Sequence, residues 1–156
     1  MLPTSDETPP VQALHYPPAP RAHKPKQAAA KEVTAWLTAL PVTTVVAFAD
    51  GATSGNALSA WGAAVYHKGS LVATDSSPLA GGEICDAELV ALHEALNLAC
   101  RMAPQGTTDI ALLSDSQNTL DIALGKPAKS SFKRATQLRQ AILTCGYKVT
   151  PKWVPL

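Results

Sequence analysis

The sequence predicts an α/β domain on a mixed five-stranded sheet, with three antiparallel strands, two parallel additions and flanking helices. Two observations lead to this prediction. Three β-branched and apolar segments separated by short turns come first, a pattern typical of an antiparallel meander. Further apolar strand segments then follow helical segments, and a strand that follows a helix returns to the sheet in parallel through a crossover.

The first part of the chain differs in composition from the rest. Residues 1–28 hold 7 of the 13 prolines and few large aliphatic side chains. Since proline fixes φ and removes a backbone donor, we expect a disordered proline-rich tail there. Residues 29–41 are expected to form a leading helix that ends at a proline, and residues 42–156 to form the domain itself. The apolar stripe of the leading helix consists of Val33, Trp36, Leu37 and Leu40.

The meander is expected to contain strands at residues 42–50, 60–67 and 70–75, each rich in β-branched or apolar side chains. Residues 51–59 are small and polar, and therefore predict a turn between the first two strands. The dipeptide Lys68-Gly69 separates the second and third strands. A connection of this length is suited to a tight hairpin.

The second half of the chain alternates between helix and strand patterns. A strong amphipathic helix is predicted at residues 84–102, then a strand at 108–114 and a short helix at 116–124. A longer helix at 130–144 and a strand at 148–154 complete the series. The side chains of the longer helix that are expected to face inward are Phe132, Leu138, Ile142 and Leu143.

The charge distribution is uneven although the net charge is only +1. No acidic residue follows Asp121, whereas 7 of the 13 basic residues do. Such asymmetry indicates a surface that binds a polyanion. The alternative is an ordinary solvated helix surface.

The cysteines and the apolar runs bear on the cellular environment. Cys85, Cys100 and Cys145 are odd in number and have no CxxC spacing, which favours buried free thiols in a reducing compartment over a disulfide framework or a zinc site. We find no secretory signal pattern, and no apolar run approaches the roughly 18 residues of a membrane span. We therefore expect an intracellular protein, cytoplasmic or nuclear, that is not secreted and has no membrane partner.

Three carboxylates lie at positions where α/β folds commonly carry their functional side chains. Asp50 closes the first strand, Asp115 directly follows the fourth, and Glu88 lies near the start of the long helix. If the two strands are parallel neighbours, both aspartates leave the sheet at one edge, about 5 Å apart. Carboxylates this close repel each other, and a divalent cation such as Mg²⁺ removes that conflict. Two such ions about 4 Å apart activate water and stabilise the leaving oxygen of a phosphodiester.

Each of these residues also has a purely structural interpretation. An aspartate before glycine is common in turns, a glutamate in a first helical turn favours the helix dipole, and an aspartate before a helix is a common N-cap. His93 lacks a partner one helical turn away, which favours a surface or partly packed histidine over a metal ligand. Trp61 and Tyr66 are aromatic strand residues, so a core position is favoured over base stacking.

Four short motifs occur in order on this pattern of elements. They are "FADG" at 48–51, "DAEL" at 86–89, "SDSQ" at 114–117 and "KWVP" at 152–155. Together they resemble the ribonuclease H family. The segment from about residue 28 to the last residue is especially similar to the domain at the C-terminal end of fungal non-LTR retrotransposon reverse transcriptases.

The resemblance implies Mg²⁺-dependent cleavage of the RNA strand of RNA–DNA hybrids, with Mn²⁺ as an alternative ion. By motif, Asp50 would bridge two metal ions, while Glu88 and Asp115 would complete the site on the leaving-group side. The nucleic acid, an RNA–DNA hybrid or another form, is the implied partner. The residues expected to contact it are Gly51, Ser116, Gln117, Lys129, Lys133 and Arg134.

The sequence departs from the family pattern at two places. Ala52 stands where the family often has serine after "DG", which removes one polar contact. The family continues after "WVP" into Gly-His and a helix that carries a fourth aspartate, whereas here Pro155 is followed by Leu156. We therefore expect a C-terminally truncated domain whose hydrolysis is impaired. The alternative is an inactive retrotransposon-derived remnant that at most binds nucleic acid; a small-molecule enzyme lacks any cofactor motif.

Overall fold

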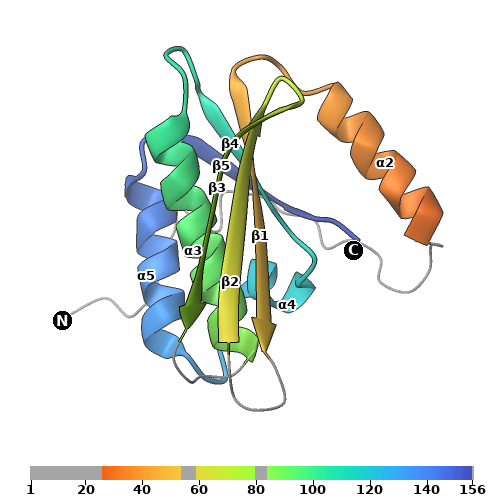
Figure 1. Ribbon diagram of the computed structural model, residues 1–156. Helices are drawn as coiled ribbons and strands as arrows, with labels where there is room; N and C mark the ends of the chain where they lie inside the picture. The colour runs from red at the N-terminus through yellow and green to blue at the C-terminus, as the bar shows by residue number, and fades with distance from the viewer. Residues whose placement is uncertain (1–25, 54–58, 80–83, 156) are drawn as a thin grey trace.

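A mixed five-stranded sheet in the order β3-β2-β1-β4-β5 forms the centre of the computed structural model, which describes residues 26–53, 59–79 and 84–155 (Figure 1). The strands β1, β2 and β3 are antiparallel, and β4 and β5 extend the sheet in parallel. The strands are β1 (Thr44–Thr53), β2 (Ser59–His67), β3 (Ser70–Leu79), β4 (Asp109–Ser114) and β5 (Lys148–Trp153). The predicted fold class is confirmed.

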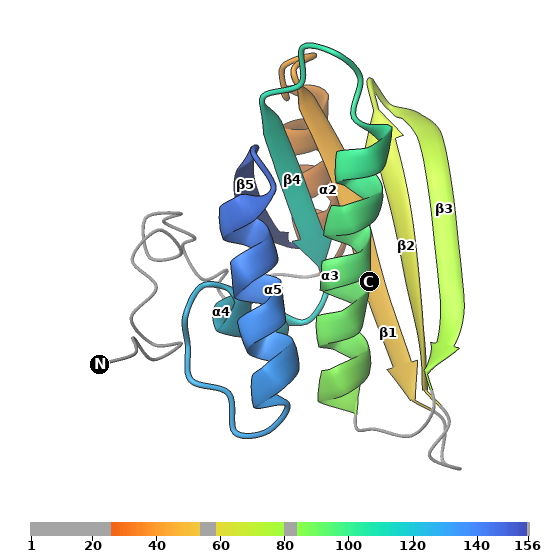
Figure 2. The same cartoon turned by 90° about the vertical axis from the view of Figure 1, so that its left-hand side faces the viewer.

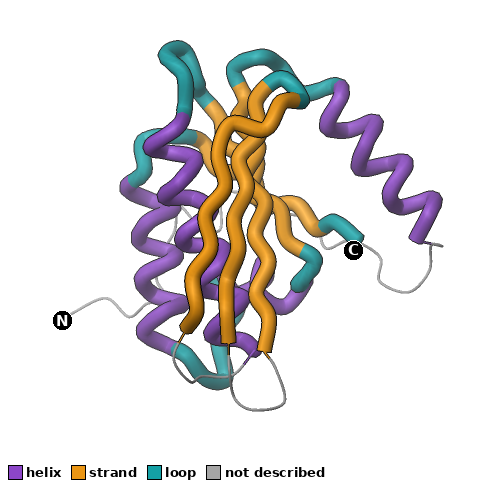
Figure 3. Tube along the Cα trace, in the orientation of Figure 1, coloured by secondary structure: helices purple, strands orange, loops and turns teal. Residues whose placement is uncertain are grey.

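Helices cover both faces of this sheet, as Figure 3 shows in purple against the orange strands. α3 and α5 lie side by side on one face, and α2 lies on the other (Figures 1 and 2). The helices are α2 (Lys26–Thr38), α3 (Ile84–Met102), α4 (Gln117–Ala123) and α5 (Phe132–Thr144). The order of elements along the chain is the predicted one.

The meander is longer than the sequence pattern predicted. Lys68 and Gly69 both have positive φ, 53° and 76°, so the predicted tight turn between β2 and β3 is confirmed. β1 continues beyond Asp50 because its last residues remain paired with β2. β3 likewise runs four residues past Asp75, through Pro78, because it pairs with the whole of β2. Backbone pairing with β2 keeps both of these polar ends in the sheet, although the sequence pattern predicted a turn from residue 51 and ended the third strand at residue 75.

The main core lies between the sheet and the α3–α5 layer. Leu89, Leu92 and Leu96 of α3 are at most 1% exposed and pack against alternate residues of the central strands. Leu138 and Ile142 of α5 are buried there, as predicted. The inward position predicted for Phe132 is wrong. Its side chain is 65% exposed at the first residue of α5.

A smaller apolar cluster lies on the α2 face of the sheet. Val46, Leu113 and Val154 are buried there, and Trp36 of α2 packs against them. The Nζ atom of Lys152 lies 5.2 Å from the centre of the Trp36 ring, a cation–π contact that links β5 to α2. Lys152 and Val154 therefore take part in the packing on this face.

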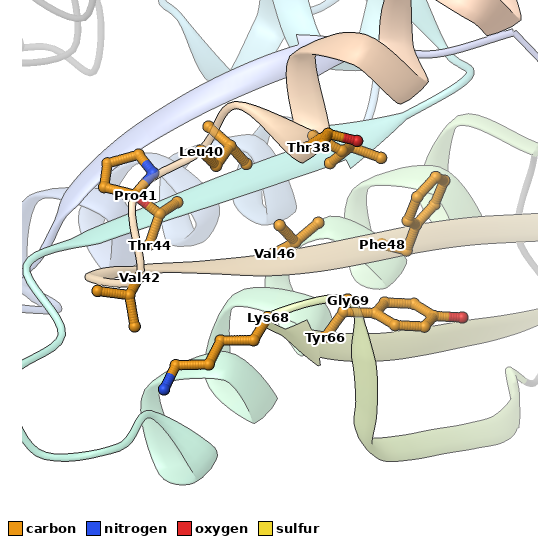
Figure 4. Close-up of a pocket in the computed structure, with 11 residues that line it drawn as sticks. Thr38, Leu40, Pro41, Val42, Thr44, Val46, Phe48, Tyr66, Lys68 and Gly69 are labelled. Carbon is orange, nitrogen blue, oxygen red and sulfur yellow. The ribbon is translucent and has the colours of Figure 1, made fainter.

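An apolar cavity of about 620 Å³ opens between the end of α2 and the sheet (Figure 4). Leu40 and Pro41 line it on the helix side, and Val46, Phe48 and Tyr66 line it on the sheet side. None of its lining residues is acidic. This cavity therefore lacks the chemistry expected of a metal site.

Some expectations about the chain as a whole fall outside what the structure describes. The tail predicted at 1–28 lies almost entirely outside the described residues, and the division into tail, leading helix and domain stays a prediction. The leading helix itself spans Lys26–Thr38, slightly before the predicted 29–41. Within the described residues, no helix has both the length and the apolar character to cross a membrane. The intracellular location stays a prediction.

Candidate metal centre

Three carboxylates meet at the carboxyl edge of the central strands. Asp50 comes from β1, Glu88 from the start of α3, and Asp115 from the residue after β4. One oxygen of each lies within 4.8 Å of the others. The structure thus brings together all three residues that the sequence singled out.

The strand register explains how the two aspartates meet. β1 and β4 are parallel, and Ala49 is paired with Ser114. The next residue on each strand is an aspartate, so both carboxylates leave the sheet at the same level and on adjacent strands. This is the arrangement expected from the sequence pattern.

Glu88 reaches the same point because α3 approaches β1 very closely at Gly51. A β-carbon added at Gly51 would lie 2.5 Å from the carbonyl carbon of Ala87 and 2.6 Å from the amide nitrogen of Glu88. The Gly51 N–H donates a hydrogen bond of 3.2 Å to Glu88 Oε1. Only glycine permits this approach, and it fixes the glutamate beside the aspartates.

The environment of Glu88 is unfavourable for a lone carboxylate. Its side chain is 8% exposed, and its Oε2 atom has no hydrogen-bond partner. Burial, and then the charge of Asp115, raise the pKa of Glu88 to about 7, against the lowering effects of Gly51 N–H and Ser114. Burial and the charge of Asp115 also raise the pKa of Asp50.

These properties fit a divalent cation. An unpartnered buried carboxylate oxygen and two adjacent carboxylates offer only oxygen ligands, which Mg²⁺ and Mn²⁺ both prefer. A cation would replace the lost hydration of Glu88 and remove the repulsion that raises these pKa values. The donor set by itself does not distinguish Mg²⁺ from Mn²⁺.

Known structures share this arrangement of the chain. The N-terminal ribonuclease H domain of a Mycobacterium tuberculosis protein, solved as a fusion with maltose-binding protein, is 24% identical, with a TM-score of 0.61 over 72% of this chain and 82% of that one. Ribonuclease H1 of the halophilic archaeon Halobacterium salinarum is 28% identical, with a TM-score of 0.61 over 72% and 86%. The chain has the ribonuclease H fold.

A third ribonuclease H structure, LC11 ribonuclease H1 in complex with an RNA/DNA hybrid, is 17% identical, with a TM-score of 0.57 over 71% of this chain and 85% of that one. No protein-family model and no curated protein sequence matches the chain. The resemblance to ribonuclease H domains is confirmed by the structures. The narrower resemblance to the fungal retrotransposon domain stays a prediction.

Asp115 is held by a contact that the sequence did not reveal. The Trp153 Nε1–H donates a hydrogen bond of 3.1 Å to the carbonyl oxygen of Asp115. The Val154 N–H donates to the carbonyl of Ser114, and the Ser114 hydroxyl accepts from the Ser116 N–H. In this ribonuclease H fold, β5 therefore positions the third carboxylate. "KWVP" was recognised as a motif, but no local pattern pairs it with Asp115.

The Trp153→Phe variant is expected to bind divalent cations about 3- to 10-fold more weakly, since one hydrogen bond worth about 1 kcal/mol is lost and Asp115 is less firmly held. Phenylalanine retains most of the ring that packs against the core. Isothermal titration with Mn²⁺ measures the change. Trp36→Phe, on the opposite face of the sheet, is the control, and equal affinities of the two variants would contradict the positioning role.

The elevated pKa of Glu88 predicts a distinctive pH dependence in metal-free protein. Folded Glu88 holds its proton up to about pH 7, whereas an unfolded glutamate releases it near its ordinary value of 4.5. The folded state therefore binds more protons in this window, and stability falls as pH rises from 4.5 to 7. The expected loss is about 1 to 2 kcal/mol once solvent screening is allowed for.

Urea denaturation at a series of pH values in chelator measures this effect. The Glu88→Gln variant lacks the titrating group, so the difference in unfolding free energy between it and the original chain should grow between pH 4.5 and 7 and then level off. Saturating Mg²⁺ should remove most of that difference above pH 7, because it stabilises the ionised carboxylate. A difference independent of pH would show that Glu88 titrates normally.

Other residues that were expected to contact nucleic acid make contacts within the fold. The Ser116 hydroxyl caps α4 by accepting from the Thr119 N–H. Gln117 is 5% exposed and donates from Nε2 to Asp121. Gly51 is buried, and its lack of a side chain allows the backbone of α3 to approach it closely. Contacts of Gly51, Ser116 and Gln117 with nucleic acid stay predictions.

The basic residues divide into exposed and engaged groups. Lys129 and Lys133 are exposed, as a phosphate-binding role requires. Arg134 forms an ion pair with Asp86, with 3.4 Å between Nε and Oδ1. Arg139, also among the basic residues after Asp121, is 3% exposed and donates to the carbonyls of Ile122 and Lys126 at the end of α4. Arg134 and Arg139, two of the basic residues after Asp121, therefore make contacts within the fold.

The start of α5 lies at the same end of the molecule as the carboxylates. Asp86, two residues before Glu88 on α3, pairs with Arg134 and accepts a hydrogen bond from the Ser131 hydroxyl. This connection places the exposed Phe132 and Lys133 beside the start of α3, the same end of that helix that carries Glu88. The sequence pattern predicted a core position for Phe132, whereas its side chain is exposed at the first residue of α5.

Proposed function

We propose that this domain is a divalent-cation-dependent endonuclease that cleaves the RNA strand of RNA–DNA hybrids, with Mg²⁺ as its ion. The observation that supports the proposal most directly is the cluster of Asp50, Glu88 and Asp115 at the carboxyl edge of β1 and β4. Its occurrence on a ribonuclease H fold, one of whose neighbours was solved with an RNA/DNA hybrid, favours nucleic acid as the substrate.

The three carboxylates differ in exposure in a way that suits this reaction. Asp50 is exposed, Asp115 is partly buried and Glu88 is buried. Asp50 would therefore meet both the ion and the substrate, while Glu88 and Asp115 would hold the ion from the protein side. When bound, the cation supplies Lewis-acid activation of water and neutralises charge on the leaving oxygen. The three carboxylates would orient the cation.

Hybrid binding is proposed to involve the exposed residues at the start of α5. Lys133 would meet a backbone phosphate, and Phe132 offers an apolar ring for a sugar or a base. The exposed Lys129 would provide a second positive charge for the nucleic-acid backbone. Gly51, Ser116 and Gln117 remain in the proposed contact set through the motif resemblance, and Arg134 remains in it as one of the basic residues after Asp121. All four already make contacts within the fold.

The Lys133→Ala variant is expected to bind a hybrid a few-fold more weakly and to reduce the slope of log affinity against log salt by about 0.7 to 0.9. Fluorescence anisotropy with chelator present measures binding without cleavage. Lys148→Ala is the matched control, because this exposed lysine begins β5 at the opposite end of the sheet from the carboxylates. Equal losses in the two variants would refute a specific contact at Lys133.

A second candidate function is nucleic-acid binding without cleavage. The observation that favours it is that three carboxylates form the cluster among the described residues, whereas the family resemblance implies four. We accordingly propose that hydrolysis by the 156-residue chain is slow. We also propose, from the order of the four motifs, that the domain is related to the domains of fungal retrotransposons.

The deciding experiment uses the 156-residue chain and an RNA strand labelled at one end and annealed to DNA. Cleavage of this RNA in Mg²⁺ or Mn²⁺, with none in chelator and none of matched RNA–RNA or DNA–DNA duplexes, is the expected result. Asp115→Asn should abolish cleavage, whereas Asp75→Asn, an exposed β3 carboxylate outside the cluster, should not. Salt-sensitive binding without cleavage would favour the second candidate, and absence of both would overturn the two together.

A further inference from the structure

An aspartate is paired with a basic residue at the start of α5, where the proposed nucleic-acid surface lies. Asp86 is in the first turn of α3, and its Oδ1 atom lies 3.4 Å from Arg134 Nε and accepts a hydrogen bond from the Ser131 hydroxyl. In Figure 2, α3 and α5 begin at the same end of the molecule, which is the end where β1 finishes. Glu88, two residues further along α3, contacts Gly51 of β1 instead. The first turn of α3 is therefore connected to both the metal centre and α5.

The ion pair leaves most of the Arg134 guanidinium available to a ligand. It joins the Asp86 carboxylate to Nε, and it is the ion pair of this guanidinium within the parts of the chain that the structure describes. The two Nη atoms carry four further N–H donors, in a planar fork that matches two oxygens of one phosphate. The Arg134 side chain is 41% exposed, against 22% for Asp86. The fork can therefore meet a phosphate from solvent while Nε is held by the protein.

Stability alone is a poor explanation for this pair. An ion pair as exposed as this one adds little to stability. The buried Leu138 and Ile142 already anchor α5 in the main core. A carboxylate on a surface that attracts a polyanion also weakens that attraction. The position of Asp86 beside Arg134 is therefore unfavourable for nucleic-acid binding unless the carboxylate orients the guanidinium.

We propose that Asp86 is a positioning residue for Arg134, which it holds so that both Nη atoms bind one backbone phosphate of the hybrid. The inference rests on the proposed function, because it specifies how one member of the contact set binds a phosphodiester. An open hollow of about 640 Å³ provides room for that phosphate. The residues that line the hollow are Asp86, Ser131, Phe132, Lys133, Arg134 and Gln137.

Fluorescence anisotropy in chelator compares hybrid binding by the 156-residue chain and by Asp86→Asn. Asparagine retains an oxygen that accepts from the Ser131 hydroxyl, and it removes the charge that pairs with Arg134. If Asp86 only adds negative charge, its removal tightens the binding of a polyanion. Loss of a positioned fork instead weakens binding, and we expect a loss of about 3- to 10-fold. The slope of log affinity against log salt should also fall by about 0.7 to 0.9, because one phosphate contact is lost.

A double-mutant cycle isolates the coupling between the two residues. Arg134→Ala should weaken hybrid binding to about the same extent as Asp86→Asn. In the Arg134→Ala background, Asp86→Asn should no longer weaken binding, because no guanidinium remains to be oriented. Asp86→Glu, which keeps the charge, should retain most of the affinity. Asp109→Asn is the control for loss of one carboxylate, because Asp109 begins β4 at the opposite end of the sheet, and it should not weaken binding.

The outcomes separate this inference from the proposed function. Equal or tighter hybrid binding by Asp86→Asn, or additive effects of the Asp86 and Arg134 substitutions, would overturn the positioning role. Either result would leave the proposed cleavage of hybrids intact. Absence of hybrid binding by the original chain would overturn the proposed function, and the positioning role with it.

Discussion

The Gly51→Ala variant is expected to lose about 3 kcal/mol of unfolding free energy, one of the two largest effects foreseen for a single substitution in this chain. A β-carbon at this position would lie 2.5 Å from Ala87 C, 2.6 Å from Glu88 N and 2.7 Å from Ala87 O. All three are backbone atoms within α3, so no side-chain rotation relieves the overlap. The helix must move away from β1, and Glu88 moves with it.

Thermal and urea denaturation measure this loss, and a fall in melting temperature of about 10 °C accompanies it. Gly62→Ala is the matched control, because Gly62 is paired with Asp50 on the neighbouring strand and its added β-carbon would meet only Asp50 O at 3.9 Å. Alanine should be neutral or slightly stabilising there. Equal effects of the two substitutions would contradict the close approach of α3.

The Asp50→Asn variant is expected to lose cation binding and at least about 100-fold in hydrolysis, since one of three charged ligands becomes neutral. Without metal the same change should stabilise the fold. The charge of Asp50 contributes to raising the pKa of Glu88, and burial and Asp115 raise that of Asp50 itself. Removing one of these mutually repelling carboxylates relieves that conflict.

Melting temperature measured with and without Mg²⁺ separates these two effects. The original chain should melt higher in Mg²⁺, whereas Asp50→Asn should melt higher than the original chain in chelator and gain nothing from Mg²⁺. Asp75→Asn is the control for loss of an exposed strand carboxylate, and it should retain the Mg²⁺ response. A Mg²⁺ response preserved in Asp50→Asn would show that the cluster does not bind the ion through this residue.

Most of the fold was predictable because it follows from short-range patterns. The 84–102 helix was predicted at its observed bounds from its apolar stripe, and the hairpin at Lys68-Gly69 from its length and its glycine. The errors occurred where tertiary contacts override local composition. The polar ends of β1 and β3 remain strand because β2 pairs with them, and Phe132 is exposed at the first residue of α5.

The candidate site was predictable in its residues and not in its energetics. The positions of Asp50 and Asp115 follow from the parallel pairing of β1 with β4, whose last pair, Ala49 with Ser114, lies one residue before each aspartate. The burial of Glu88, its pKa of about 7 and its unpartnered oxygen follow from how closely α3 approaches Gly51. A carboxylate's pKa depends on every charge and dipole around it, and these come from distant parts of the chain.

By itself, the sequence determined the order of helices and strands, the parallel addition of β4 and β5, and the identity of the three carboxylates. These depend on residue periodicity, turn chemistry and crossover handedness, which act over a few residues or follow from chain order. Only the tertiary structure decided that Trp153 holds Asp115 and that Arg134 pairs with Asp86. Each of these contacts joins residues that are far apart in the sequence, and only packing of whole elements brings such residues together.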